Sequence, residues 1–139
     1  MATNFKDIRA AIKKEIDDHA TKVQNAYNYE RSTFEGFPAV IIAPSENEAD
    51  YGSTQKDRLV FIFKVRAFYP IPDEGEHSDA EGALEEVVDE ILGLFKERGV
   101  LGSACDWVEP APGSWYYEER GEGVYRVAEI TLRCVKYVA

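Results

Sequence analysis

The sequence predicts an α+β fold: a two-layer sandwich in which two amphipathic helices cover one face of a mainly antiparallel, mixed sheet. Two segments carry apolar residues at the helical period, and two long segments alternate between apolar and polar residues. The connections between predicted strands are of hairpin length, which favours antiparallel pairing. Because the 139 residues contain no internal repeat and no long linker, we expect a single domain, residues 1–139.

Helices are expected at residues 4–21 and 79–98. Their apolar stripes consist of Phe5, Ile8, Ile12 and Ile16 in the first, and of Ala80, Ala83, Leu84, Val87, Val88, Ile91, Leu94 and Phe95 in the second. Charged residues occupy the other side of each segment, which is typical of a helix that packs one face on a core. Acidic residues begin the second helix and Lys96 lies near its end, an order that suits the helix dipole, and Gly99 is the expected stop.

Strands are expected at residues 23–29, 39–43, 57–69, 104–109, 115–119 and 124–138. The core-facing residues of the two longest are Leu59, Phe61, Phe63, Val65, Ala67 and Tyr69, and Ala128, Ile130, Leu132 and Cys134. Polar residues 44–55 indicate an exposed loop or a hairpin tip, and residues 110–113 indicate a proline-rich turn. An acidic connection, residues 70–78, leads into the second helix.

The two longest strands do not fit easily inside a compact globule. A chain of this length has a diameter of about 37 Å when treated as a sphere. Thirteen and fifteen extended residues span about 44 and 51 Å. The strands must therefore coil, break at bulges or project, and projecting strand edges are covered when subunits close into a ring.

Acidic residues dominate the charge. The net charge is -10, and nine acidic and no basic residues lie between Arg66 and Lys96. This pattern disfavours a protein that grips nucleic acid, because phosphates are bound by clustered basic residues. The residues Glu81, Glu85, Glu86 and Asp89 form either an ordinary solvated helix face or an acidic surface that lines a lumen.

No catalytic, cofactor or metal motif is found, so we expect a protein that is not an enzyme. The only histidines are His19 and His77, and neither has a nucleophile pattern nearby. The acidic residues around His77 lack the spacing of a calcium loop and form at most a weak cation site. Cys105 and Cys134 match no metal pattern and are expected to be reduced and structural.

Partner contacts are expected in the polar loops and in an aromatic group beside prolines. The candidate interface residues are Glu46, Glu48, Tyr51, Arg58, Glu74, Trp107, Trp115, Tyr116 and Tyr117. Trp and Tyr are enriched in binding hot spots, although these rings are equally consistent with closing one end of the core. The first residues lack the apolar region of a signal peptide, and no apolar run of about 18 residues occurs, so we expect synthesis in the cytoplasm.

The order of elements resembles the tail terminator (tail completion) proteins of long-tailed bacteriophages. The resemblance rests on the leading helix, on the sequences VQNAYNY at 23–29 and FEGFPAV at 34–40, on a long strand before the acidic helix, and on the closing strand through Cys134. It implies a virion protein of the tail or neck that forms a homohexameric ring. Such a ring caps the tail tube, stops its polymerisation and meets the head connector, while DNA passes through without specific binding.

Other interpretations remain open at the level of sequence. The chain is also similar to neighbouring head-tail joining or neck proteins, which have the same style of fold. A small domain that binds or inhibits a host protein would use the acidic helix face and the Trp and Tyr residues as its contact surface. A metal-assisted enzyme built around His77 is the third interpretation.

Overall fold

The computed structural model describes residues 5–50, 57–72, 75, 77–97, 104–121 and 123–138, with the side chains of 46–50, 57, 58 and 138 left out of the description. It confirms the α+β class. The elements in chain order are α1 (Phe5–His19), β1 (Asn25–Tyr27), β2 (Ala39–Asp50), β3 (Asp57–Pro70), α2 (Ser78–Glu97), β4 (Trp107–Arg120) and β5 (Gly123–Val138).

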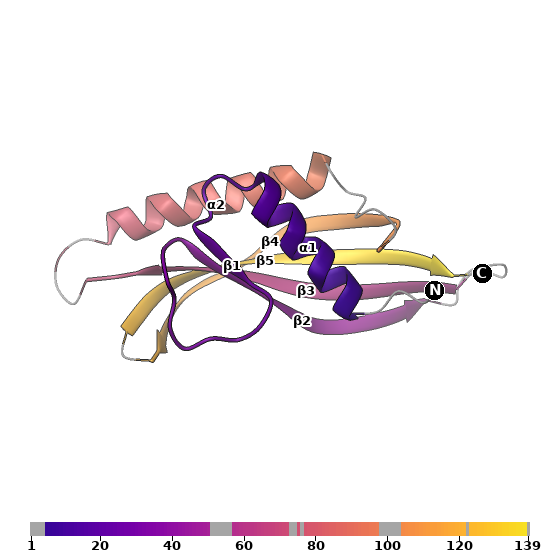
Figure 1. Cartoon of the computed structure of the whole chain (residues 1–139), viewed down its shortest axis with the longest axis horizontal. Coiled ribbons are helices and arrows are strands. Elements are labelled where there is room, and N and C mark those ends of the chain that lie inside the picture. The colour runs from indigo at the N-terminus through magenta and orange to yellow at the C-terminus, as the bar shows by residue number, and fades with distance from the viewer. Residues whose placement is uncertain are drawn as a thin grey trace.

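The strands form one five-stranded sheet with the order β1-β2-β3-β5-β4. The pairing of β1 with β2 is parallel, and the other three pairings are antiparallel. β3 and β5 form the long central pair, with an unbroken register from Asp57↔Val138 to Pro70↔Tyr125. Figure 1 shows that these strands run along the longest axis of the molecule and continue beyond the helices.

Both helices pack on the same face of the sheet and enclose the main core. The buried residues of this core come from α1 (Ile8, Ile12, Ile16), from α2 (Leu84, Val87, Ile91, Phe95) and from the central strands (Phe63, Val65, Ala128, Ile130, Leu132). These residues are the apolar stripes and strand faces that the sequence predicts. Each large apolar side chain buried in this way stabilises the fold by about 1.5–3 kcal/mol.

β2 is longer than expected, and the predicted loop at 44–55 is wrong over its first half. Residues up to Asp50 pair with β3, and the register shifts between Pro44 and Glu46. Pro44 is tolerated at this position because the ladder is interrupted there, so the missing N–H of proline does not leave a hydrogen bond unmade. Pairing with the long β3 therefore overrides the weak strand propensity of this polar segment.

β4 also differs from the prediction, because residues 107–120 form one strand rather than two short strands around a turn. The prolines at 110 and 112 lie within the strand, and the register shifts between Pro112 and Trp115. β4 is an edge strand, where proline removes no hydrogen bond to a further strand. At the other edge, β1 is restricted to Asn25–Tyr27 instead of the expected 23–29.

A second apolar cluster lies on the face of the sheet opposite the helices. Its buried residues are Tyr27, Ala39, Ile41, Phe68 and Val127, and Phe34, Phe37, Tyr116 and Tyr125 pack against them. The segment between β1 and β2, residues 28–38, contributes Phe34 and Phe37, and we call it the covering loop. Gly121, with a φ of 60°, approaches this loop so closely that a Cβ atom would lie 2.8 Å from the carbonyl oxygen of Ser32.

The same substitution should have opposite effects at two glycines. Gly121→Ala should lower the free energy of unfolding by about 1–3 kcal/mol, because alanine is strained at positive φ and meets the Ser32 carbonyl. Gly82→Ala, on α2 with no atom within 4 Å of the added Cβ, should raise it by about 0.5–1 kcal/mol. Urea unfolding measures both. Equal shifts of the same sign would contradict this description of the β4–β5 turn.

Candidate assembly interface

The end of the sheet away from the covering loop carries a third apolar cluster, on the face opposite the helices. Val60, Ile62 and Val135 are buried there, and Trp107 and Tyr137 pack against them. Val60 pairs with Val135, which pairs with Trp107, so one row crosses three strands. We call these five residues the far-end cluster.

Polar contacts hold the two aromatic rings of the far-end cluster in place. The indole nitrogen of Trp107 donates a hydrogen bond of 3.0 Å to the carboxylate of Glu109, which also accepts from Arg133 at 3.0 Å. The backbone N–H of Tyr137 donates to the Asp106 carboxylate at 2.6 Å, and the rings of Tyr137 and Trp107 lie 5.2 Å apart. These contacts leave an ordered pair of large aromatic side chains at the edge of the sheet.

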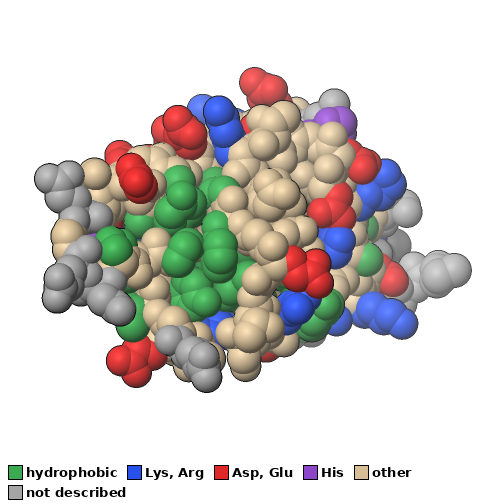
Figure 2. Space-filling model, turned by 60° about the vertical axis from the view of Figure 1, so that its left-hand side comes forward, with side chains coloured by type: hydrophobic (Ala, Val, Ile, Leu, Met, Phe, Trp, Pro, Cys, Tyr) green, Lys and Arg blue, Asp and Glu red, His purple; other side chains and the backbone are tan. Residues whose placement is uncertain are grey.

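At the opposite end, the aromatic residues around the covering loop reach the surface. Phe34 contacts Phe37 and Tyr125 with ring centroids 5.8 and 5.5 Å apart, and Phe37 contacts Tyr125 at 5.7 Å. These three partly buried residues are called the near-end patch. Figure 2, which brings this end of the molecule forward, shows hydrophobic side chains gathered between charged ones. Partly exposed aromatic side chains therefore lie at both ends of the sheet face opposite the helices.

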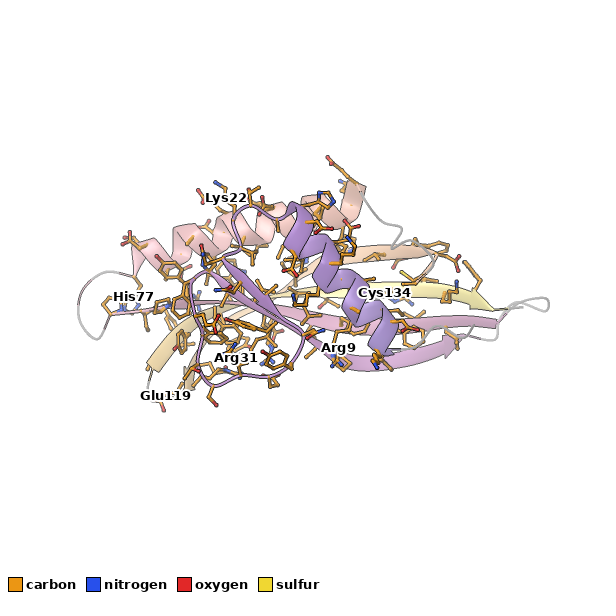
Figure 3. All side chains as sticks on the ribbon, in the orientation of Figure 1. Arg9, Lys22, Arg31, His77, Glu119 and Cys134 are labelled. Carbon is orange, nitrogen blue, oxygen red and sulfur yellow. The ribbon has the colours of Figure 1, made fainter. Side chains whose placement is uncertain are left out.

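An ion-pair network holds the covering loop on the sheet. The Glu30 carboxylate accepts hydrogen bonds from Arg66 and from Arg120, the second at 2.9 Å. Arg120 also donates to the carbonyl oxygen of Arg31 at 2.9 Å, and its guanidinium lies 5.0 Å from the centre of the Phe68 ring. Arg31 itself, labelled in Figure 3, stacks 4.4 Å above the Tyr27 ring. Local sequence patterns do not predict this network, because it joins segments that are far apart in the chain.

Four charged residues, Glu30, Lys64, Arg66 and Glu129, form a strip between the near-end patch and the far-end cluster, and we call it the charged strip. It borders a hollow of about 250 Å³ that is lined by Glu30, Ala43, Pro44, Ser45, Lys64, Arg66 and Glu129. The charges in this hollow are already paired: Arg66 binds Glu30, and the ammonium group of Lys64 lies 3.6 Å from Glu129. The hydroxyl of Tyr116 donates to the same Glu129 carboxylate at 2.9 Å. This arrangement stabilises the sheet face and leaves no uncompensated charge to attract a small ligand.

The acidic face of α2 has the predicted residues, but they differ in their contacts. Glu85, Glu86 and Asp89 are exposed, and Glu86 lies 3.9 Å from Lys22. Glu81 instead binds Arg126 at 2.5 Å. Glu85, Glu86 and Asp89 thus remain solvated carboxylates, with Lys22 beside Glu86, while Arg126 pairs with Glu81.

The predicted aromatic group is divided by the structure. Trp107 belongs to the far-end cluster, while Trp115 packs against the main core. Tyr116 faces the other side of the sheet, and Tyr117 is 51% exposed beside His77, with ring centroids 5.9 Å apart. Alternation along β4 explains this separation, because successive side chains point to opposite faces.

Several predicted contact residues fall outside the description. Tyr51 and Glu74 lie outside the described residues, as do the acidic neighbours of His77 at positions 73, 74 and 76. The backbones of Glu46, Glu48 and Arg58 are strand residues, paired with Ile62, Val60 and Asp50, but their side chains are not described. Within the described ranges no group of three His, Cys, Asp or Glu residues could hold a metal ion. Neither helix, as far as it is described, is long and apolar enough to cross a membrane.

Neither protein-family models nor curated proteins match the sequence. The surfaces described above are therefore the basis on which a function is proposed.

The hydroxyl of Tyr116 should report the integrity of the charged strip at high pH. Burial, and then the hydrogen bond to the Glu129 carboxylate, raise the pKa of Tyr116 to about 12. Since an unfolded tyrosine ionises near pH 10, this group stabilises the fold fully below about pH 10, and its contribution is lost as the pH rises toward 12. Unfolding free energies of the native chain and of Tyr116→Phe should converge over this window. Parallel curves would contradict the assigned hydrogen bond.

Proposed function

We propose that this chain is a structural, non-enzymatic subunit of a bacteriophage tail. In this proposal it assembles into a ring that caps the tail tube, ends tube polymerisation and offers a surface to the head connector. The observation that carries the proposal is the far-end cluster. In it Val60, Ile62 and Val135 are buried, while Trp107 and Tyr137 stay partly exposed at one end of the sheet face opposite the helices.

The positions of the two apolar surfaces favour a head-to-tail contact. The far-end cluster and the near-end patch lie at opposite ends of the same long strands, so one copy can bring its far end to the near end of the next. A contact between two different surfaces of identical subunits is heterologous, and it gives a ring when the rotation between copies closes. Aromatic residues at such a contact supply large buried areas at low entropic cost.

The edges of the sheet support the same arrangement. β1 pairs with β2 only at Ala39, Val40 and Ile41, so the outer edge of residues 42–50 has no strand partner in the described part of the chain. Exposed edges of this kind attract further strands. β4, at the opposite edge, is blunted by Pro110, Pro112 and a register shift. A neighbouring subunit that covers the β2 edge would prevent unwanted strands from pairing with it.

The acidic face of α2 suits a ring through which DNA moves. Exposed carboxylates at Glu85, Glu86 and Asp89 repel phosphates, so a lumen lined by them lets DNA pass without holding it. The resemblance to tail terminator proteins supports a position of the ring in the virion, between tail tube and head connector. The histidine contacts fit a structural role, because His19 lies 3.8 Å from Glu15 on the same helix and His77 packs on Tyr117.

Sedimentation across a range of concentrations, alone and with tail tubes, tests the proposal. We expect a concentration-dependent species several times the mass of the 15.7 kDa chain, or its appearance when tubes are added. A chain that stays monomeric under both conditions contradicts the proposal.

A second candidate function is a small domain that binds a host protein. It is favoured by Tyr117, which is 51% exposed and lies 4.5 Å from the guanidinium of Arg126 beside the acidic helix. Capture of one host protein by the native chain, with loss of that capture in Tyr117→Ala, distinguishes this function from ring formation.

Removal of the partly buried indole of Trp107 should weaken self-association. Trp107→Ala should lower the association constant at least about tenfold, since truncating an interface Trp commonly costs about 2 kcal/mol or more. Tyr117→Ala is the matched control, because it removes a large aromatic ring from the opposite face of the same strand. Sedimentation of both variants, with melting temperatures to confirm folding, gives the comparison. Equal loss of association in the two variants, or none in either, would argue against the far-end cluster as the contact.

Salt should promote assembly. Each subunit has a net charge of -10, so copies repel one another at low ionic strength. Raising the salt concentration from about 0.05 to 0.5 M shortens the Debye length from roughly 14 to 4 Å and should shift the equilibrium toward the ring. Light scattering at fixed protein concentration follows the change. Dissociation on addition of salt would indicate a contact held mainly by ion pairs instead of apolar surfaces.

A further inference from the structure

The only two cysteines of the chain lie together in the main core. Cys105 precedes β4 and is 1% exposed, and Cys134 lies within β5 and is fully buried. Both side chains belong to the buried main-core cluster, and the Cys105 thiol donates to the carbonyl oxygen of Trp107 at 3.6 Å. Figure 3 labels Cys134 on the half of β5 that approaches the C-terminus. The two cysteines therefore meet in one buried cluster, although 29 positions separate them in the sequence.

The backbone around Cys105 is fastened to β5 beside Cys134. The N–H of Asp106 donates to the carbonyl oxygen of Val135 at 2.8 Å, and the Asp106 carboxylate accepts from the N–H of Tyr137 at 2.6 Å. In the ladder, Val108 is the partner of Cys134. These contacts hold the segment that carries Cys105 against the strand that carries Cys134, so the thiols remain together as long as the strands are paired.

We propose that Cys105 and Cys134 are a modification site: they form an intramolecular disulfide when the protein meets a small disulfide such as oxidised glutathione. The bond would clamp the start of β4 to β5. This inference rests on the thiol pair and is independent of ring assembly.

The disulfide forms by two successive thiol–disulfide exchange reactions. One protein thiolate attacks a sulfur of the glutathione disulfide, which forms a mixed disulfide and releases one glutathione thiolate. The second protein thiolate attacks the protein sulfur of that mixed disulfide and releases the second glutathione. The two electrons and two protons lost by the protein thiols end on two molecules of reduced glutathione.

The environment of the pair makes this exchange slow at neutral pH. The hydrogen bond with Cys105, followed by burial, raises the pKa of the Cys134 thiol, so little thiolate is present near pH 7. In a reducing cytoplasm the pair stays reduced, whereas oxidising surroundings draw it slowly to the disulfide. Exchange should accelerate as the pH rises.

Refolding in a glutathione redox buffer tests the inference. Both thiols are buried in the folded chain, but glutathione reaches them while the chain is still unfolded. The full chain is denatured and reduced, then refolded with oxidised and reduced glutathione. We expect the intact mass to fall by about 2 Da, for two hydrogens lost, and both free thiols to disappear when assayed in denaturant. The melting temperature should rise by roughly 5–10 °C and return after reduction.

The single variants Cys105→Ser and Cys134→Ser are the controls. Each should keep one thiol, accept at most one glutathione and show no stabilisation by the oxidised buffer. Two titratable thiols in the refolded native chain would overturn the inference. So would glutathione adducts or disulfide-linked dimers as the main products, because they show that the two sulfurs do not reach each other.

Discussion

The pairing of β3 with β5 is the constraint on which the rest of the structure depends. These strands are in register over the 14 residues of β3, and no bulge interrupts them. Since side chains alternate between the two faces, this single register assigns Phe63 and Ile130 to the helix-covered core and Phe68 and Val135 to the opposite face. A slip by one residue would exchange the faces and expose the core. The register shifts occur instead in the two outer pairings, of β2 with β3 and of β4 with β5.

From this register follows the order of surfaces on the face opposite the helices. The near-end patch lies where the covering loop crosses the sheet, the ion pairs of Arg66 and Lys64 occupy the middle, and the far-end cluster lies at the other end of β3 and β5. At both ends of this face, partly buried aromatic side chains rim a buried apolar cluster. This geometry, more than any group of reactive side chains, supports the proposal of an assembling subunit.

Local patterns in the sequence were sufficient for the helices and the central strands. The spacing of Ile8, Ile12 and Ile16 predicts α1, and alternation predicts which residues of β3 and β5 face the main core. The strand at 44–50 and the continuous β4 were not predictable, because pairing with a long neighbour decides both. Trp107 was expected at an interface, but its neighbours Val60 and Ile62 were missed. They alternate with the core residues of β3, and only the fold shows that they form a separate buried cluster on the face opposite the helices.

The most direct measurement is the growth of tail tubes in the presence of the chain. A tail-tube protein encoded in the same genome would be polymerised with and without it, and the tube ends would be imaged by electron microscopy. We expect rings of this chain to sit on tube ends and growth to stop at those ends, with Trp107→Ala impaired and Tyr117→Ala unaffected. Tubes that grow to the same lengths, with bare ends, in the presence of the folded native chain would contradict it.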